Sequence, residues 1–194
     1  MKNIHFGDKQ FDKGYFSGKS ACGYPNGYSK QTIKYYNCWT IPEEDSKFIN
    51  DLKIKTYFEI GCACGYLMEE LMKYHIKVKG WDISEYIVNQ ASPKVKLFIE
   101  IKSIDNIISL PDKFYDLVHI SGVIGYISID ELDFYLAQIK RIAKKYVIIY
   151  AGTPEDAPEE NNIRGINQSD EWWKKQYSKY FKEKDLSKDL WEIA

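Results

Sequence analysis

A run of small residues interrupts what is otherwise a strand followed by a helix, and it is the first place where this sequence could bind a ligand. Residues 58–67, Phe-Glu-Ile-Gly-Cys-Ala-Cys-Gly-Tyr-Leu, end an apolar strand and restart as a helical pattern. Small residues at such a bend let a ligand contact backbone N–H groups at a helix N-terminus. Glu59 adds a carboxylate two residues before the bend. The stretch predicts a binding turn for a ligand with a cationic part.

A second carboxylate, Asp82, ends the next predicted strand, twenty-one residues after Gly61. A carboxylate in this place can accept hydrogen bonds from both hydroxyls of a ribose. In a doubly wound sheet, the two elements meet outside the carboxyl ends of adjacent strands. The two residue groups together predict a pocket for a nucleoside.

Two other interpretations of the glycine turn stay open. Nicotinamide dinucleotide binders use G-x-G-x-x-G, whereas Gly65 here follows Ala63 by only two positions. Glu59 would also repel a pyrophosphate, but it would suit a ligand that carries an ammonium group and a sulfonium. A dinucleotide-binding oxidoreductase is therefore the weaker alternative, and a chance glycine turn in another α/β protein is the third.

The surrounding pattern indicates which elements position these residues. Short apolar runs alternate with helical patterns from Lys55 onward, which is typical of βα units around a mostly parallel sheet. Strands are expected at 57–60, 78–81, 95–99, 116–120 and 146–150, with a brief last strand within 189–194. Helices are expected along Leu67, Leu71 and Tyr74, after the N-cap Ser84 through Ala91, along Leu132, Leu136, Ile139 and Ala143, and from Asp170 through a Lys-rich face over 174–184.

The chain of 194 residues suits one core, with a distinct N-terminal flank. Residues 11–42 are rich in Gly, Tyr, Ser and Pro, and we expect residues 1–45 to form a cap on a ligand-binding domain at 46–194. Tyr15, Tyr24 and Tyr28 are candidates to touch the cofactor or a second substrate. Ordinary packing on the sheet edge is the alternative.

The set Glu59, Gly61, Ala63 and Gly65 resembles the first motif of the class I S-adenosylmethionine-dependent methyltransferases, with alanine in place of the middle glycine. Asp82 matches the family's ribose carboxylate, and Asp105, Leu110-Pro111 and residues 115–118 match a further segment loosely. The resemblance covers about residues 55–150, and residues 171–173 resemble the small-molecule and glycan branches.

The resemblance implies a Rossmann-like α/β fold, with a doubly wound, mostly parallel sheet of about seven strands and helices on both faces. It implies S-adenosyl-L-methionine as cofactor and S-adenosyl-L-homocysteine as product. The cofactor-binding residues would be Glu59, Gly61, Cys62, Ala63, Gly65, Asp82, Ile83, Ile104, Asp105, Ser121 and Gly122.

The implied reaction is methyl transfer to the oxygen or nitrogen of a small molecule, a sugar or a glycan. A hydroxyl acceptor would gain from a general base, and histidine is best matched to neutral pH. His119, near the cleft end of the fourth strand, is the best candidate; His5 and His75 are placed less well, and a structural role for His119 stays open. Tyr126 and Arg164, the latter in the long loop at 153–168, are candidates for substrate contact.

Composition excludes several other classes. Twenty-seven basic against twenty-eight acidic residues give a net charge of −1, which offers no support for nucleic-acid binding. No apolar run could cross a bilayer, the N-terminus lacks a signal peptide's apolar centre, and the four cysteines favour reduced thiols over a metal site. We therefore expect a cytoplasmic protein without a metal. A SAM-binding subunit that is not catalytic or that depends on a partner remains the second hypothesis, and a homodimer stays open.

Overall fold

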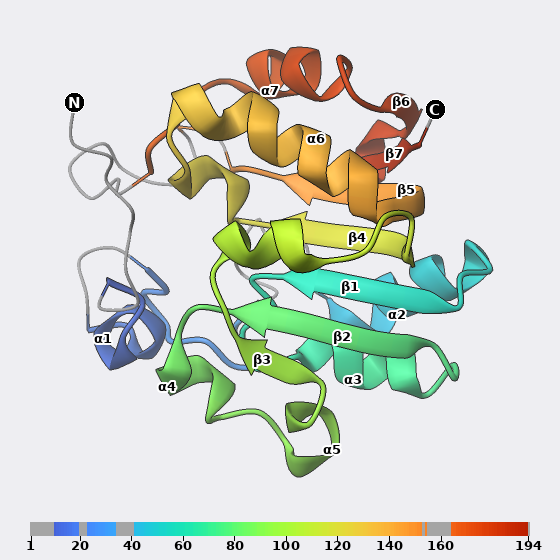
Figure 1. The fold of residues 1–194 in the computed structure, drawn as a ribbon. Coiled ribbons are helices and arrows are strands. Elements are labelled where there is room, and N and C mark those ends of the chain that lie inside the picture. Colours follow the sequence, from blue (N-terminus) through green and yellow to red (C-terminus); the bar gives the residue numbers. More distant parts are fainter. Residues whose placement is uncertain (1–9, 20–22, 34–40, 153, 155–163, 194) are drawn as a thin grey trace.

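The computed structural model describes residues 10–19, 23–33, 41–152, 154 and 164–193. A seven-stranded sheet in the order β3-β2-β1-β4-β5-β7-β6 runs through the middle (Figure 1). Its strands are β1 (Thr56–Ile60), β2 (Lys77–Asp82), β3 (Ile99–Ile101), β4 (Tyr115–Ser121), β5 (Ala143–Tyr150), β6 (Lys182–Asp185) and β7 (Leu190–Glu192). The pairs among β1 to β5 are parallel, and β7 is antiparallel to both β5 and β6. The predicted fold class is confirmed.

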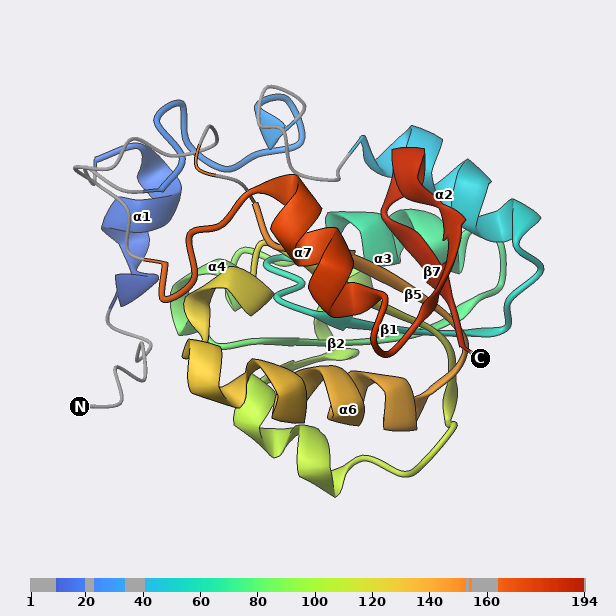
Figure 2. The same cartoon turned by 90° about the horizontal axis from the view of Figure 1, so that it is seen from above.

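Helices cover both faces of the sheet, with α6 on one side and α2 and α3 on the other (Figure 2). The α-helices are α1 (Lys13–Ser17), α2 (Pro42–Asp51), α3 (Tyr66–Met72), α4 (Glu85–Val88), α5 (Pro93–Lys96), α6 (Leu132–Ile142) and α7 (Asp170–Tyr177). Short 3-10 turns are η3 (Ile104–Ser109), η4 (Ile124–Tyr126), η5 (Ile129–Glu131) and η8 (Leu186–Lys188).

Two buried clusters follow from strand alternation, because successive side chains of a strand point to opposite faces. Phe58 and Val118 belong to the cluster under α6, whereas Tyr57 and Leu117 belong to the cluster under α3. Leu67 of α3 joins the second cluster, as its helical spacing predicts. The sheet is therefore buried on both sides, which explains the nearly continuous apolar strands.

The third strand lies later than predicted. Residues 93–96 form α5, with Pro93 in the first helical turn and Val95 buried beneath, and β3 begins only at Ile99. Proline fits a first turn because its missing N–H has no partner there in any case. The expected strand at 95–99 is wrong for its first four residues.

Four other boundaries differ from the sequence prediction. Helix α3 ends before Tyr74, α4 ends at Val88 before Ala91, and Ala143 starts β5 rather than ending α6. The Lys-rich segment 174–184 is helical only to Tyr177, because Lys182 and Lys184 lie on β6. The burial pattern of β6 is almost fully exposed, so its residues carry no apolar alternation that would mark a strand.

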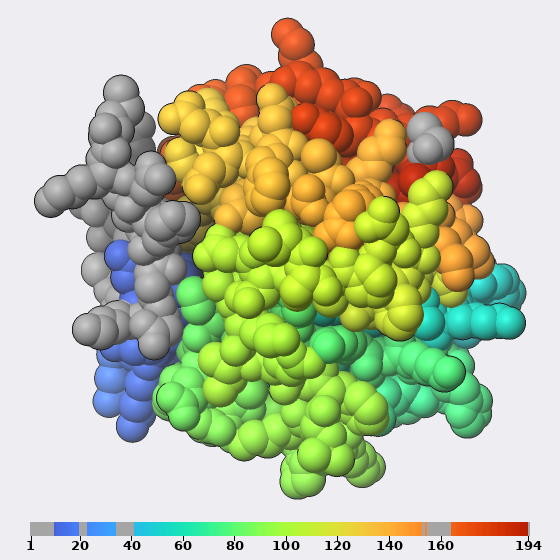
Figure 3. All heavy atoms as spheres, in the orientation of Figure 1, coloured from blue at the N-terminus to red at the C-terminus, as the bar shows by residue number. Residues whose placement is uncertain are grey.

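The N-terminal segment lies at the carboxyl ends of the strands. In Figure 1 the arrowheads of β1 and β2 point towards α1, and in Figure 3 the blue segment occupies the same end of the molecule. Asp12 caps α1 by accepting a hydrogen bond from the Tyr15 N–H at 3.1 Å, and Tyr15 and Phe16 are buried. Within the described residues, no helix has the length and apolar character to cross a membrane, and no cluster of His, Cys, Asp or Glu could hold a metal.

Candidate functional site

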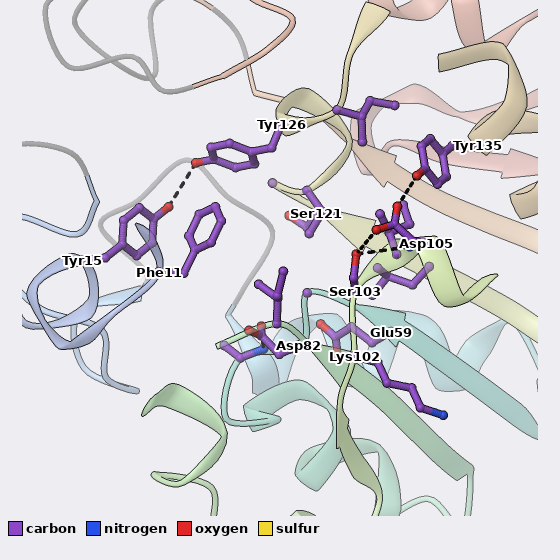
Figure 4. A pocket seen from close by; sticks show the side chains of 18 of the residues that line it. Phe11, Tyr15, Glu59, Asp82, Lys102, Ser103, Asp105, Ser121, Tyr126 and Tyr135 are labelled. Carbon is purple, nitrogen blue, oxygen red and sulfur yellow. Dashed lines mark hydrogen bonds between the residues drawn. The ribbon is translucent and has the colours of Figure 1, made fainter. Parts of the chain in front are cut away.

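A cavity of about 320 Å³ opens where β1, β2 and β4 end and where the N-terminal segment covers them (Figure 4). Its walls come from three parts of the chain: residues 11–28, the strand ends and turns of the sheet, and residues 121–135. The cavity is lined by Phe11, Tyr15, Phe16, Tyr24, Tyr28, Glu59, Ile60, Gly61, Ala63, Asp82, Ile83, Lys102, Ser103, Ile104, Asp105, Ser121, Gly122, Val123, Tyr126, Ile127, Ser128, Glu131 and Tyr135.

The bend after β1 depends on backbone conformations that most residues avoid. Gly61, Ala63 and Gly65 have φ angles of 79°, 49° and 73°. A Cβ at Gly61 would come within 2.2 Å of Val123 Cγ2, so glycine is needed there for space as well as for φ. Ala63 adopts the left-handed region with a side chain, at a cost of roughly 1 kcal/mol.

Asp82 ties the end of β2 to this bend. Its Oδ2 accepts the Ala63 N–H at 2.7 Å, and its Oδ1 accepts the Ser84 N–H at 2.8 Å. Burial raises the pKa of Asp82 to about 6, against the opposing effect of these backbone hydrogen bonds. A carboxylate offers about four acceptor sites, so each oxygen keeps one for a ligand hydroxyl. The predicted pocket of bend and carboxylate is therefore present.

Glu59 lies in the same wall, and the pKa of its carboxyl group is unusually high. Its pKa is raised to about 8, mainly by burial; the Tyr57 hydroxyl opposes this shift and the Asp82 carboxylate adds to it. Among the described residues, its Oε2 atom is buried and has no hydrogen-bond partner. Because Glu59 lines the cavity and one of its buried oxygens has no partner, the carboxyl group fits an ammonium donor from a ligand.

A second polar wall is formed by η3 and its neighbours. Ser103 Oγ donates to Asp105 Oδ2 at 2.9 Å, and the Tyr135 hydroxyl donates to Asp105 Oδ1 (Figure 4). Ile83 and Ile104 line the cavity beside this carboxylate. The two bonds fix the exposed Asp105 carboxylate at the edge of the cavity, and a polar edge beside apolar side chains suits a flat base.

The turn after β4 supplies the wall between the polar groups and the cap. The N–H of Gly122 donates to the Tyr150 carbonyl at 2.8 Å, and its φ of 69° requires the left-handed region. Nothing lies within 4 Å of where a Cβ of Gly122 would be, so its backbone borders open space. Ser121 Oγ is buried, and the described residues offer it no hydrogen-bond partner.

Aromatic side chains form the opposite wall. The hydroxyls of Tyr15 and Tyr126 lie 3.1 Å apart, and the Phe11 ring packs edge-on against both rings at centroid distances of 5.1 and 5.2 Å. Tyr24 and Tyr28 also line the cavity, so the structure brings all four tyrosines predicted for this role to it.

Four predicted site residues do not line the cavity: Cys62, Gly65, Arg164 and His119. Cys62 and Gly65 belong to the bend but do not line the cavity. The Cys62 side chain is buried, and a Cβ at Gly65 would come within 2.9 Å of Ile99 Cδ1 in the interior. Arg164 packs over Gly152, whose Cβ would meet its guanidinium at 2.5 Å, rather than over the cavity. His5, Cys22, Cys38 and most of the loop at 153–168 lie outside the described residues.

His119 is the largest correction to the sequence prediction. Its side chain is fully buried, does not line the cavity, and shares a hydrogen bond of 2.6 Å between Nδ1 and the Tyr57 hydroxyl. Burial lowers the pKa of His119 to about 3. A general base must reach the acceptor's proton, and His119 is enclosed behind Glu59, so the expected catalytic role is wrong.

Sequence reasoning missed other lining residues. Phe11 and Phe16 belong to the N-terminal flank at 11–42, whose aromatic composition could have indicated them as lining residues. Lys102, Ser103, Ser128, Glu131 and Tyr135 come from turns and from α6 that carry no motif in the sequence. Only the folded chain brings them beside the bend.

The fold and the site define a class of protein. The strand order, with an antiparallel β7 beside β5, and a pocket of glycine bend and carboxylate are features of Rossmann-like α/β domains that bind nucleosides at the switch point of the sheet.

Comparison with known proteins gives one family match. A family model described as a methyltransferase domain matches residues 58–151, which is 94 of the 194 residues. Over this range the chain is similar to methyltransferase domains, and the structural neighbours share its Rossmann-like fold. No curated protein sequence gave a match.

Three solved structures illustrate the fold. A SAM-dependent methyltransferase from Archaeoglobus fulgidus is 20% identical, with a TM-score of 0.57 over 75% of this chain and 76% of that one. A Pyrococcus horikoshii protein is 17% identical, with a TM-score of 0.62 over 93% and 95% of the two chains. A protein described with the conversion of a disulfide into a thioacetal during echinomycin biosynthesis is 15% identical, with a TM-score of 0.61 over 96% and 88%.

Proposed function

We propose that the chain is a class I S-adenosylmethionine-dependent methyltransferase, which binds S-adenosylmethionine in the cavity at the carboxyl ends of β1, β2 and β4 and methylates a small-molecule, sugar or glycan acceptor at oxygen or nitrogen. The observation that carries the proposal is the joining of the glycine bend to Asp82 through the hydrogen bond from Ala63 N–H at 2.7 Å. That contact joins the backbone of the bend and the Asp82 carboxylate in one wall, which supports a pocket for a nucleoside.

The residues fit the cofactor part by part. Glu59 offers its unpartnered oxygen to the α-ammonium group, and Asp82 offers its remaining acceptor sites to the ribose hydroxyls. Ile83, Ile104 and Asp105, which line the cavity, would border the adenine, and the Ser121–Gly122 turn would lie near the sulfur. Cys62 and Gly65 support the bend from behind and make no direct contact.

The sulfonium of the bound cofactor supplies an already activated methyl group. The chain's own task is to orient the acceptor behind that carbon and to exclude water. Phe11, Tyr15 and Tyr126 cover the cavity from the side opposite the bend and supply that dry surface. An acceptor with an apolar face fits this wall, and Ser128 and Glu131 offer polar contacts beside it.

The proposed location of the enzyme is the cytoplasm. Cys62 and Cys64 are free, buried thiols, which suits a reducing compartment. Burial raises the pKa of Cys64 to about 11, so the thiol stays protonated and inert at neutral pH.

Calorimetric titration of the purified protein tests the proposed site. Both S-adenosylmethionine and S-adenosylhomocysteine should bind in the micromolar range, whereas NAD should give no heat. Heat with NAD and none with the two sulfur nucleosides would overturn the proposal.

Transfer of a labelled methyl group to fractions of a cell extract tests the acceptor class. The label should enter a small-molecule or glycan fraction. Transfer that begins only when a second protein is added would support the partner-dependent subunit instead.

A further inference from the structure

Three buried polar side chains lie together behind the cavity. Tyr57 and Glu59 are two positions apart on β1 and share one face of the sheet, and His119 of β4 is the register partner of Glu59. All three are buried, and only Glu59 also lines the cavity. The acid that faces the ligand thus has a polar pair directly behind it.

The three groups are within interaction distance of one another. The Tyr57 hydroxyl lies 2.6 Å from His119 Nδ1, and the same nitrogen lies 3.6 Å from Glu59 Oε1. His119 is neutral because burial lowers its pKa to about 3. With its proton on Nδ1, His119 donates to the Tyr57 oxygen, and the hydroxyl proton of Tyr57 is then free to turn towards Glu59. This arrangement can stabilise a negative charge on Glu59.

The remaining groups around Glu59 oppose that charge. Asp82 from β2 and Asp45 from α2 raise the pKa of Glu59, and burial raises it most, to about 8. The Cys62 thiol in the bend stays neutral because burial raises its pKa. The groups that face Glu59 from the packed elements, none of them cationic, are Tyr57, Asp82, His119, Asp45 and Cys62. At neutral pH the empty site therefore holds a neutral Glu59.

We propose that binding of the cofactor's α-ammonium group expels a proton from Glu59 and that Tyr57 and His119 are positioning residues which stabilise the carboxylate so formed. The neutral acid and the ammonium give a carboxylate–ammonium pair, and the proton goes to the solvent. The inference rests on the proposed placement of the methionine part beside Glu59.

Calorimetry with S-adenosylhomocysteine, in buffers of different ionisation enthalpy, counts the protons released. At pH 6.5, about one proton should leave per molecule bound, because the ligand is a free amino acid whose α-ammonium group is fully protonated at this pH. The affinity should increase nearly tenfold between pH 6.5 and pH 7.5, where Asp82, with a pKa of about 6, is already mostly ionised.

Two controls isolate the carboxyl–ammonium pair. 5′-Methylthioadenosine shares the adenosine and the thioether but lacks the ammonium group. Its binding should release at most about a quarter of a proton at pH 6.5, the share that Asp82 still holds, and its affinity should change little up to pH 7.5. In Glu59→Gln, S-adenosylhomocysteine should show the same small release. Release of a whole proton in either control would overturn the assignment to Glu59.

Two substitutions test the pair behind Glu59. Tyr57→Phe removes only the hydroxyl, so the affinity profile should move about one unit to higher pH, with proton release preserved at pH 6.5. His119→Ala should move the profile in the same direction, and His119→Asn, which keeps an N–H donor, should restore part of it. Leu117→Val, on the same face of β4, should leave the profile in place. Unshifted profiles in both Tyr57→Phe and His119→Ala would remove the positioning role.

The protein without ligand gives an independent readout. Because Glu59 keeps its proton in the folded state while it is ionised in the unfolded chain, the free energy of unfolding should fall as pH rises from 6.5 to 8. The slope should be measured above pH 7. There Asp82, with a pKa of about 6, is almost fully ionised, and His119, with a pKa of about 3 in the folded protein and about 6.5 in the unfolded chain, is mostly neutral in both states. Glu59→Gln should remove the slope.

The two levels of failure are distinguishable. If S-adenosylhomocysteine binds at pH 6.5 without proton release, the inference is wrong and the proposed function stands. If the folded protein does not bind S-adenosylhomocysteine at any pH, the proposed site is wrong as well.

Discussion

The two walls of the cavity are built in different ways. The wall at Glu59–Ile83 comes from one short stretch of sequence and consists of backbone turns and carboxylates joined by hydrogen bonds. The opposite wall joins residues far apart in the chain: the Tyr15 and Tyr126 hydroxyls meet across 111 positions. The first wall depends on backbone geometry, which tolerates few side chains, whereas the second depends on aromatic surface, which can be altered piecemeal. We expect substitutions in the first wall to abolish cofactor binding, and substitutions in the second wall to change its affinity or rate only slightly.

The largest effect should come from Asp82→Ala. It removes the acceptor for the proposed ribose hydroxyls and leaves the Ala63 and Ser84 N–H groups without their partner. Hydrogen bonds to a charged group contribute about 1.5–3 kcal/mol each, so S-adenosylhomocysteine should bind at least ~100-fold more weakly by calorimetry. Asp82→Asn, which keeps one acceptor oxygen, should lose less. A folded Asp82→Ala protein that binds within threefold of the wild type would contradict the site.

A large effect on stability is expected for Gly61→Val. The new side chain would overlap Val123 Cγ2 and would have to adopt a φ of 79°. Overpacking and left-handed strain together should cost about 3 kcal/mol in urea denaturation and weaken cofactor binding. Adding Val123→Ala should recover part of the loss, because it relieves the overlap but not the strained φ. No recovery in the double variant would show that the backbone conformation accounts for the whole effect.

Substitutions in the aromatic wall, which includes Phe11, Tyr15 and Tyr126, should have smaller effects. Tyr15→Phe and Tyr126→Phe each keep the ring and its edge contacts with Phe11 but remove one member of the hydroxyl pair. One neutral hydrogen bond contributes about 1 kcal/mol, so S-adenosylhomocysteine should dissociate about fivefold faster in stopped-flow fluorescence. Tyr86→Phe, at a ring that stacks on Phe16 but does not line the cavity, is the matched control. A loss as large as that of Asp82→Ala would erase the distinction between the two walls.

The smallest effect should be a gain, from Ala63→Gly. Glycine adopts a φ of 49° without the cost that alanine has there, although it makes the unfolded chain more flexible. The net change should lie between zero and about 1 kcal/mol of added stability, with unchanged or slightly tighter cofactor binding. A loss of 1 kcal/mol in thermal or urea unfolding would mean that the Ala63 methyl group contributes packing that outweighs the strain.

Local patterns predicted the parts of the fold that local chemistry controls. The strands β1, β2, β4 and β5 were predictable because they are buried on both faces and are bounded by turn residues. Ser84 was predictable as a cap, since its Oγ accepts the Ile87 N–H at 3.4 Å. In contrast, the exposed β6 has no apolar alternation, and residues 93–96 have a strand-like composition but follow a proline suited to a first helical turn. Such segments take their structure from their neighbours.

The sequence by itself determined the class of ligand, because a glycine bend after one strand and a carboxylate after the next suffice to form a nucleoside pocket whenever the two strands are adjacent and parallel. Tertiary structure alone decided which side chains complete that pocket. It turned His119 into the interior beside Tyr57, moved Arg164 onto Gly152, and brought Tyr126 and Tyr135 to the wall. The physical reason is that a side chain's direction depends on strand register and on packing between distant segments, neither of which is encoded in the spacing of a single motif.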